Sequence, residues 1–139
     1  MKSIVTGGVF VAVVVLLCAG LSAADYVWTG AEDARWVNAN NWTDSSGNPV
    51  AKCPGVAASG DETADWAAAR TEADTAIFSG VSSRTTIDLA GLFAISNVKF
   101  EGASIPAYVL GTDDTQTLPL RPDAKFTIEA SVVNLPSVA

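Results

Sequence analysis

The sequence predicts an all-β fold, and the observations behind this prediction come from the part of the chain that starts at Asp74. Short segments rich in β-branched, aromatic and other apolar residues recur there about every ten residues. Each of them is bounded by Gly, Asp, Asn or Pro, which favour turns. The segments read DTAIFSG, RTTIDLAG, FAISNVKFEG, PAYVLGT, QTLPL and AKFTIEASVV. This spacing is typical of a β-sandwich, a barrel or a solenoid, and no exact repeat singles out one of them.

One of these segments shows how the strands are expected to lie. In RTTIDLAG, Thr85, Ile87 and Leu89 fall on one face of an extended chain, and Thr86 and Asp88 fall on the other. The second face is polar. We therefore expect this strand to bury one face and to expose the other to solvent.

Residues 1–24 have the composition of a secretory signal peptide. After an early lysine, an almost wholly apolar run of 18 residues extends from Ile4 to Leu21. Signal peptidase requires small side chains at positions −3 and −1, which Ser22 and Ala24 provide. We expect cleavage between Ala24 and Asp25. An uncleaved membrane anchor is the alternative, because this run has about the minimum length that crosses a bilayer.

Cleavage would leave an acidic chain with one cysteine. The full sequence has 8 Lys and Arg, 15 Asp and Glu, and a formal net charge of −7. Loss of Lys2 makes the net charge of the mature chain −8, because 7 basic residues then face 15 acidic ones. Cys53 would have no internal disulfide partner, so we expect a partly buried apolar side chain, with pairing between chains as the alternative. Cys18 follows the bulky Leu17, which disfavours lipoprotein processing.

The composition also excludes common classes of function. The sequence has no histidine, which removes Ser-His-Asp and Cys-His nucleophile systems and imidazole zinc ligands. The acidic balance argues against nucleic acid as a partner, since binding a phosphate backbone requires clustered Lys and Arg. No glycine-rich phosphate loop, C-x-x-C pair or dinucleotide fingerprint occurs, so we expect no cofactor.

Residues 25–42 contain three tryptophans, and we expect them to form N-terminal cap strands. Trp28, Trp36 and Trp42 are separated by even numbers of residues, so an extended backbone places them on one face. One interpretation is that the indoles cover the end of a β core while their N–H groups bond to a partner. The alternative is an exposed platform on which a sugar stacks, with the same three tryptophans as ligand-binding residues.

Residues 43–73 are rich in Ser, Gly, Pro, Ala and Asp, and we expect a loop or insertion. Ser59 and Glu62 have the spacing of a capping box, which predicts a short helix within it. The carboxylates that could serve a glycosidase or a calcium site are Asp61, Glu62, Asp65, Asp113 and Asp114. Each set is local and ordinary for a turn or helix start, so we expect no catalytic residue and no metal site.

Several motifs together resemble the opening of bacterial surface proteins of the autotransporter-associated β-strand repeat kind. They are Trp28-Thr29-Gly30, Trp36, Asn41-Trp42, Asp74-Thr75-Ala76-Ile77-Phe78, and Thr86-Ile87-Asp88-Leu89 followed by Gly91. The resemblance covers residues 25–139. It implies a right-handed parallel β-helix, exported and displayed at or released from the cell surface, that serves as a stalk, adhesin or surface-layer material. The family has no shared catalytic residues to carry over.

The resemblance further implies that residues 74–139 form rungs of a β-solenoid. There is room for only about three, so we expect either a fragment or a small relative whose last rung needs a cap or a partner. An uncapped solenoid end presents unpaired backbone groups and apolar side chains. Near the C-terminus those side chains are Val132, Val133, Leu135 and Val138. We therefore expect self-association through the C-terminal end of the chain.

Two functions follow from the sequence. The first is a non-enzymatic, exported structural or adhesive protein at the cell surface, associated with the outer membrane, or extracellular, whose partner is a surface or a glycan and which meets the membrane only through its signal peptide. The alternative is a secreted carbohydrate-binding module in a β-sandwich, with Trp28, Trp36 and Trp42 exposed.

Overall fold

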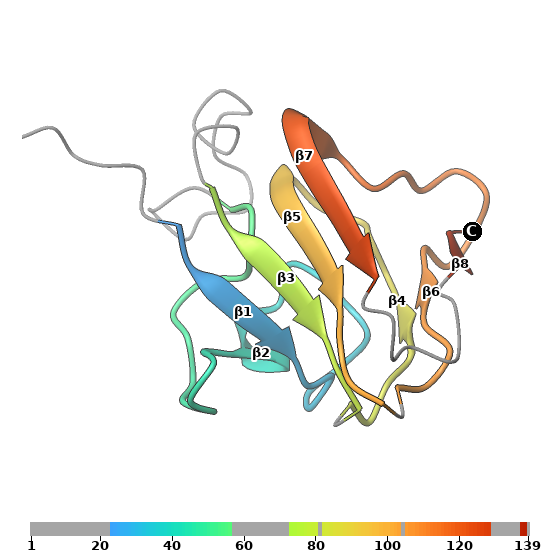
Figure 1. The fold of residues 1–139 in the computed structure, drawn as a ribbon. Helices are drawn as coiled ribbons and strands as arrows, with labels where there is room; N and C mark the ends of the chain where they lie inside the picture. The colour runs from blue at the N-terminus through green and yellow to red at the C-terminus, as the bar shows by residue number, and fades with distance from the viewer. Residues whose placement is uncertain (1–22, 57–72, 81, 104, 129–136, 139) are drawn as a thin grey trace, which may run out of the picture.

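The computed structural model describes residues 23–56, 73–80, 82–103, 105–128 and 137–138. These residues form strands almost throughout, with one short 3-10 helix (Figure 1). The elements in chain order are β1 (Asp25–Trp28), η1 (Ala39–Asn41), β2 (Trp42–Thr43), β3 (Thr75–Phe78), β4 (Thr86–Ile87), β5 (Ile95–Phe100), β6 (Val109–Leu110), β7 (Leu120–Ile128) and β8 (Ser137–Val138). The all-β expectation agrees with this content.

The strands are arranged in two sheets. The larger sheet has five strands in the order β2-β1-β3-β5-β7, and the smaller sheet has three in the order β4-β6-β8. Strands β1, β3, β5 and β7 are parallel, whereas β2 runs antiparallel to β1, so the larger sheet is mixed. Figure 1 shows the four parallel strands side by side with their arrows pointing the same way.

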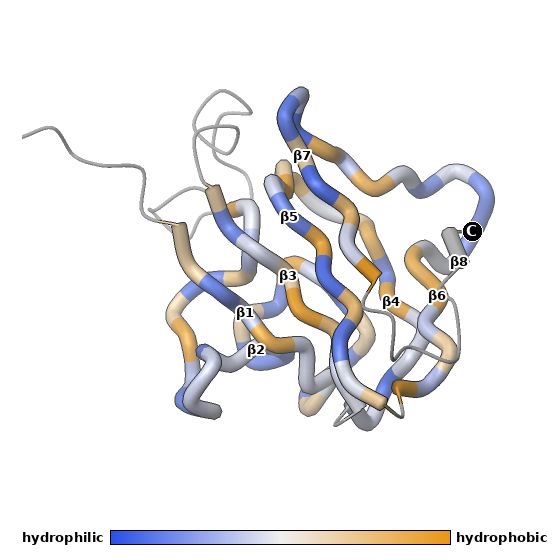
Figure 2. The backbone as a smooth tube through the Cα atoms, in the orientation of Figure 1, coloured by the Kyte–Doolittle hydropathy of each residue, from blue (hydrophilic) through white to orange (hydrophobic). Residues whose placement is uncertain are grey.

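Alternating side chains of the larger sheet build the core. From Asn97 to Phe100, hydrophilic and hydrophobic residues alternate along β5, and the apolar ones are buried (Figure 2). On the buried face Ala76 of β3 pairs with Val98 of β5, and Phe78 pairs with Phe100. All four are buried. The rings of Phe78 and Phe100 are stacked, with centroids 5.0 Å apart.

The smaller sheet packs its apolar side chains into the same core. Ile87 of β4 pairs with Leu110 of β6, and both are fully buried. Leu89 is also buried, whereas Thr86 is exposed, which confirms the alternation predicted for RTTIDLAG. One hydrophobic cluster therefore joins the side chains of both sheets.

The expected right-handed parallel β-helix is wrong for the described residues. They form two separate, open sheets of unequal strand number, and the larger one is mixed because β2 turns back on β1. The pairing of β5 with β7 is also irregular, since Ile95 pairs with Leu120 but Asn97 pairs with Lys125. The described residues therefore do not show a β-solenoid, and the prediction that residues 74–139 form solenoid rungs is wrong for them as well. The β-sandwich alternative is loosely compatible, because two sheets enclose one core.

Other expectations fall partly outside the described residues. The signal segment up to residue 22, the helix predicted near Ser59 and most of the apolar C-terminal residues belong to this group. At the expected cleavage site, Ala24 packs against the core, and its carbonyl oxygen accepts a hydrogen bond of 2.9 Å from the Thr75 N–H. Asp25 is exposed at the start of β1.

Candidate functional site

The three tryptophans of the predicted cap or platform lie inside the core. Trp28, Trp36 and Trp42 are 0%, 0% and 1% exposed. Trp42 makes edge contacts with both other indoles, at centroid distances of 5.0 and 4.9 Å. The indole N–H groups donate to the carbonyl oxygens of Arg84, Pro54 and Trp36, at 2.8, 3.0 and 2.8 Å. A sugar would have to open the core to stack on these indoles.

A polar turn before β2 is held by a buried asparagine. Asn41 Oδ1 accepts hydrogen bonds from the main-chain N–H groups of Glu32 and Asp33, and its Nδ2 donates to Asp33 Oδ1 and to the carbonyl of Arg35. Burial opposes ionisation of Asp33, but hydrogen bonds from Asn38 and Asn41 outweigh it and hold the pKa of Asp33 below its ordinary value. This network fixes the turn and leaves no polar group of Asn41 for a ligand.

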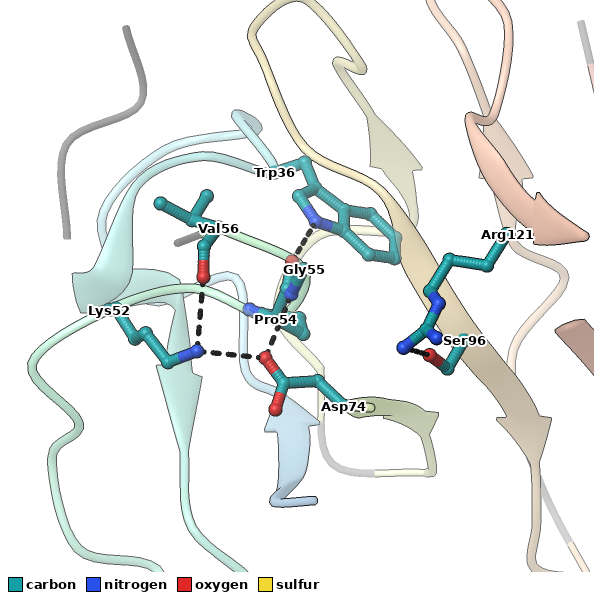
Figure 3. A network of polar contacts seen from close by, with 8 residues as sticks. All are labelled: Trp36, Lys52, Pro54, Gly55, Val56, Asp74, Ser96 and Arg121. Atoms are coloured by element: carbon teal, nitrogen blue, oxygen red, sulfur yellow. Dashed lines mark hydrogen bonds and ion pairs between the residues drawn. The ribbon is translucent and has the colours of Figure 1, made fainter. Parts of the chain in front are cut away.

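A second network surrounds Asp74, the residue before β3 (Figure 3). The Asp74 side chain is fully buried, and its Oδ2 accepts hydrogen bonds of 3.0 Å from Lys52 Nζ and from the Gly55 N–H. Lys52 Nζ also donates to the Val56 carbonyl and lies 5.8 Å from the centre of the Tyr26 ring. Lys52 therefore neutralises a charge that would otherwise be buried alone.

Backbone geometry makes Gly55 necessary in this network. Its φ is +80°, and a Cβ there would lie 2.9 Å from the Ala94 carbonyl oxygen. Asp74 Oδ1, by contrast, has no hydrogen-bond partner among the residues that the structure describes. Glycoside hydrolysis requires two carboxylates about 5–10 Å apart. The network around Asp74 contains one, which a lysine neutralises, so its chemistry is that of an anchor for the loop that carries Lys52 and Gly55.

The carboxylates considered from the sequence do not form a site in the described residues. Asp61, Glu62 and Asp65 lie outside them. Asp113 and Asp114 are exposed, and Asp113 Oδ1 accepts hydrogen bonds from the Thr115 hydroxyl and N–H, which hold the pKa of Asp113 below its ordinary value. Within the described ranges, no three His, Cys, Asp or Glu side chains are grouped to hold a metal ion.

An open groove of about 290 Å³ lies over the β1–β2 end of the larger sheet. Asp44 is its charged lining residue, and the Asp44 carboxylate is occupied by the main-chain N–H groups of Ser46 and Asn48 and by the Asn48 side chain. These bonds lower the pKa of Asp44, the Asn48 side chain contributing most. The lining residues are Val27, Trp28, Thr29, Thr43, Asp44, Ser45 and Gly47. The groove offers a mostly apolar surface.

The feature that stands out on the described surface is the edge strand β7. Leu120, Phe126 and Ile128 are 47%, 45% and 39% exposed, although they are large and apolar. Phe126 pairs with the buried Val98, and Ile128 pairs with the buried Phe100. Strand β7 therefore continues the apolar face of the sheet to its edge. This edge is the candidate interaction surface.

One polar contact helps to fix the start of β7. Arg121 Nη1 donates to Ser96 Oγ at 3.0 Å (Figure 3), and Arg121 Nε lies 3.6 Å from Asp123 Oδ1. Ser96 is the residue between the two pairings that go out of step. The contact holds the largely buried Arg121 side chain against Ser96, while Asp123 remains exposed.

Comparison with protein-family models, with curated proteins and with solved structures finds no match to this chain.

Among the residues that the structure describes, no helix has the length and apolar character needed to cross a membrane.

Proposed function

We propose that this chain is a non-enzymatic, exported structural or adhesive protein that acts at or outside the cell surface through the β7 edge of its larger sheet. The observation that carries the proposal is the exposure of Leu120, Phe126 and Ile128 along one edge strand. Contiguous exposed apolar side chains at a sheet edge are typical of surfaces that bind another chain or surface.

The use of the buried polar groups supports a non-catalytic role. The side chain of Asn41 is satisfied within its turn, and Asp74 is paired with Lys52. Neither network faces the groove over β1 and β2, which is lined by other residues. A catalytic site requires acid, base or nucleophilic groups beside a cavity that holds the substrate.

The sequence of residues 1–24 supports export, because its apolar run and its small residues before Asp25 have the order of a signal peptide. The carbohydrate-binding alternative required exposed indoles, and Trp28, Trp36 and Trp42 are buried. No described observation favours that alternative.

Export is tested by fractionation of cells that produce the full chain, with an antibody raised against residues 25–139. We expect the product outside the cytoplasm, with Asp25 as its first residue by mass spectrometry. Val13→Arg, which places a charge in the apolar run, should hold the chain in the cytoplasm, whereas Ser3→Arg adds the same charge beside Lys2 and should not. A wild-type chain that stays cytoplasmic overturns the proposal.

The role of the edge is tested by attachment of beads that carry the purified chain to source cells or their extracted surface material. Phe126→Asp should reduce attachment at least about tenfold, because it places a charge in the exposed apolar row. Thr86→Asp places the same charge at an exposed position of β4 and serves as the matched control. Equal attachment of all three proteins contradicts a role for β7.

A further inference from the structure

The expected cleavage site lies at the start of the larger sheet, where β1 and β3 run side by side (Figure 1). The Ala24 carbonyl oxygen accepts a hydrogen bond of 2.9 Å from the Thr75 N–H, and Asp25 pairs with Thr75 in the parallel ladder. The Ala24 side chain packs against the hydrophobic core. The peptide bond between Ala24 and Asp25 therefore joins two residues that the fold holds against β3.

The next residue anchors this arrangement. Tyr26 is 5% exposed, belongs to the core and pairs with the buried Ala76 of β3. Moving Ala24 and Asp25 far enough from β3 to enter the cleft of a protease also pulls Tyr26 away from its core contacts. Such a movement exposes apolar surface to water, which is unfavourable. The start of β1 is therefore not a freely fraying end.

Signal peptidase requires the same groups that β3 holds. Hydrolysis of a peptide bond begins with attack on the carbonyl carbon, and the carbonyl oxygen must enter an oxyanion hole of the enzyme. Here that oxygen is the one on Ala24, which accepts from Thr75 in the folded chain. The Ala24 side chain must also enter the enzyme's pocket for a small residue at position −1, although it packs against the core. The enzyme and the fold compete for one carbonyl group and one side chain.

We propose that folding closes the cleavage site, so that signal peptidase must cut this chain before β1 pairs with β3. The chain then meets the enzyme unfolded, and a precursor that folds first stays uncut. The cut removes Ala24, so its hydrogen bond to Thr75 belongs to the uncut precursor. This inference rests on the proposed export of the chain, because it takes residues 1–24 as a signal peptide.

The distance along the sequence between the bonded residues gives the enzyme time to act. Thr75 follows Ala24 by about 50 residues. When export accompanies synthesis at about 5–20 residues per second, Thr75 is added roughly 3–10 s after Ala24. The other neighbour of β1 is β2, which pairs with Val27 and Trp28 and leaves Ala24 uncovered. The site is open during this interval.

Cleavage of the purified precursor in a folded and an unfolded form tests the order of events. The full chain of 139 residues, in detergent micelles, is incubated with signal peptidase and compared with Phe78→Asp/Phe100→Asp, which places two charges in the core and should not fold. Circular dichroism checks both states. We expect the folded wild type to be cut at least about tenfold more slowly, because only its opened form is a substrate.

The outcomes separate this inference from the proposal of export. Equally fast cleavage of both proteins overturns the inference and leaves the signal peptide intact as a proposal. If the unfolded variant is not cut after Ala24, residues 1–24 are not a substrate of signal peptidase, and the proposal of export fails together with the inference.

A spacer variant tests the position of the site independently of stability. Insertion of Asp-Gly-Ser-Gly-Ser between Ala24 and Asp25 keeps an aspartate after the cut and moves the Ala24 carbonyl away from Thr75. This variant, although folded, should be cut about as fast as the unfolded chain. The same insertion between Asp114 and Thr115, in an exposed turn, is the matched control and should leave the precursor resistant. A folded spacer variant that resists cleavage as the wild type does contradicts the proposal.

Discussion

Phe126 of β7 packs against Phe100 of β5 with ring centroids 5.4 Å apart, yet Phe100 is fully buried and Phe126 is 45% exposed. The two residues occupy the same apolar face of neighbouring strands. What separates them is that Phe100 has a strand on both sides, whereas Phe126 lies at the edge of the sheet. The apolar face thus continues past the point where the described chain covers it.

This relationship predicts unequal costs of truncation. Phe100→Ala should lower the free energy of unfolding by about 3–5 kcal/mol, as for a fully buried aromatic side chain. Phe126→Ala should cost less than about half of that, because much of its ring already contacts water. Urea unfolding of dilute protein checks both values, and equal costs would mean that Phe126 is covered in solution.

The pair of Asp74 and Lys52 predicts an uneven response to loss of charge. Lys52→Met should lower the free energy of unfolding by about 3–5 kcal/mol, because it leaves the buried Asp74 side chain without its charged partner. Asp74→Asn should cost less, about 1–2 kcal/mol, since the amide oxygen still accepts from Gly55 and Lys52 is partly exposed.

The double variant Lys52→Met/Asp74→Asn separates the ion pair from simple packing. Because it removes the buried charge along with its partner, it should be more stable than Lys52→Met alone. Chemical unfolding of the wild type, the two single variants and the double variant gives the four free energies of unfolding that this double-mutant cycle compares. A double variant whose loss equals the sum of the single losses would show that the two side chains are not coupled.

Asp33 predicts a dependence of stability on pH. Its pKa is lowered in the folded chain by hydrogen bonds from Asn38 and Asn41, against the opposing effect of burial. The unfolded state therefore binds more protons near pH 4, so the stability from Asp33 is fully present above its unfolded pKa and is lost as pH falls through the lower folded value. Asp33→Asn should flatten the increase in unfolding free energy between pH 3 and pH 6, measured against Asp114→Asn in an exposed turn. An unchanged slope would rule out Asp33 as its source.

The buried tryptophans predict a fluorescence result. In a Trp66→Phe background, which removes the indole outside the described residues, emission should be blue-shifted and resistant to iodide, because Trp28, Trp36 and Trp42 are in the core. Soluble polysaccharides should leave the spectrum unchanged. Quenching comparable to free indole, or a shift on adding a glycan, would restore the sugar-stacking alternative.

The hydrogen bond accepted by the Ala24 carbonyl predicts that the stability of the mature chain depends on its first residue. Its hydrogen bond to the Thr75 N–H adds a main-chain contact just before β1. A chain that starts at Asp25 lacks this acceptor and should be about 0.5–1.5 kcal/mol less stable than one that starts at Ala23. Thermal and urea unfolding of the two proteins compare them directly, and equal stability would show that the bond contributes nothing.

Local features of the fold could be predicted from the sequence. The alternation in RTTIDLAG indicated which side chains of that segment would be buried, and Ile87 and Leu89 are buried while Thr86 is exposed. Alternation of this kind depends only on the two-residue period of an extended chain, so a short segment suffices to show it. The even spacing of the tryptophans does not account for their shared burial, because Trp28 and Trp42 belong to different strands and the chain between them turns.

Contacts between distant residues could not be predicted in this way. Asp74 pairs with Lys52, 22 positions earlier, and nothing in the composition of either segment indicates that the two meet. The prediction of a solenoid was wrong for a related reason. Strand pairing and sheet closure depend on residues far apart in the sequence, whereas the resemblance rested on short motifs, and the described strands form open sheets. The predicted segments QTLPL and AKFTIEASVV leave a gap between Leu120 and Ala124; the structure joins them in β7, but the pairing with β5 is irregular across that gap.

Hydrogen–deuterium exchange of the full chain, alone and mixed with extracted surface material of the source cells, tests the central role of the β7 edge most directly. We predict that peptides covering residues 120–128 exchange rapidly in the free protein and become protected in the mixture, because a bound partner then covers the free edge. Peptides covering β5, which is paired on both sides, should exchange at the same rate in both samples. Exchange in residues 120–128 that the surface material does not change would contradict the account.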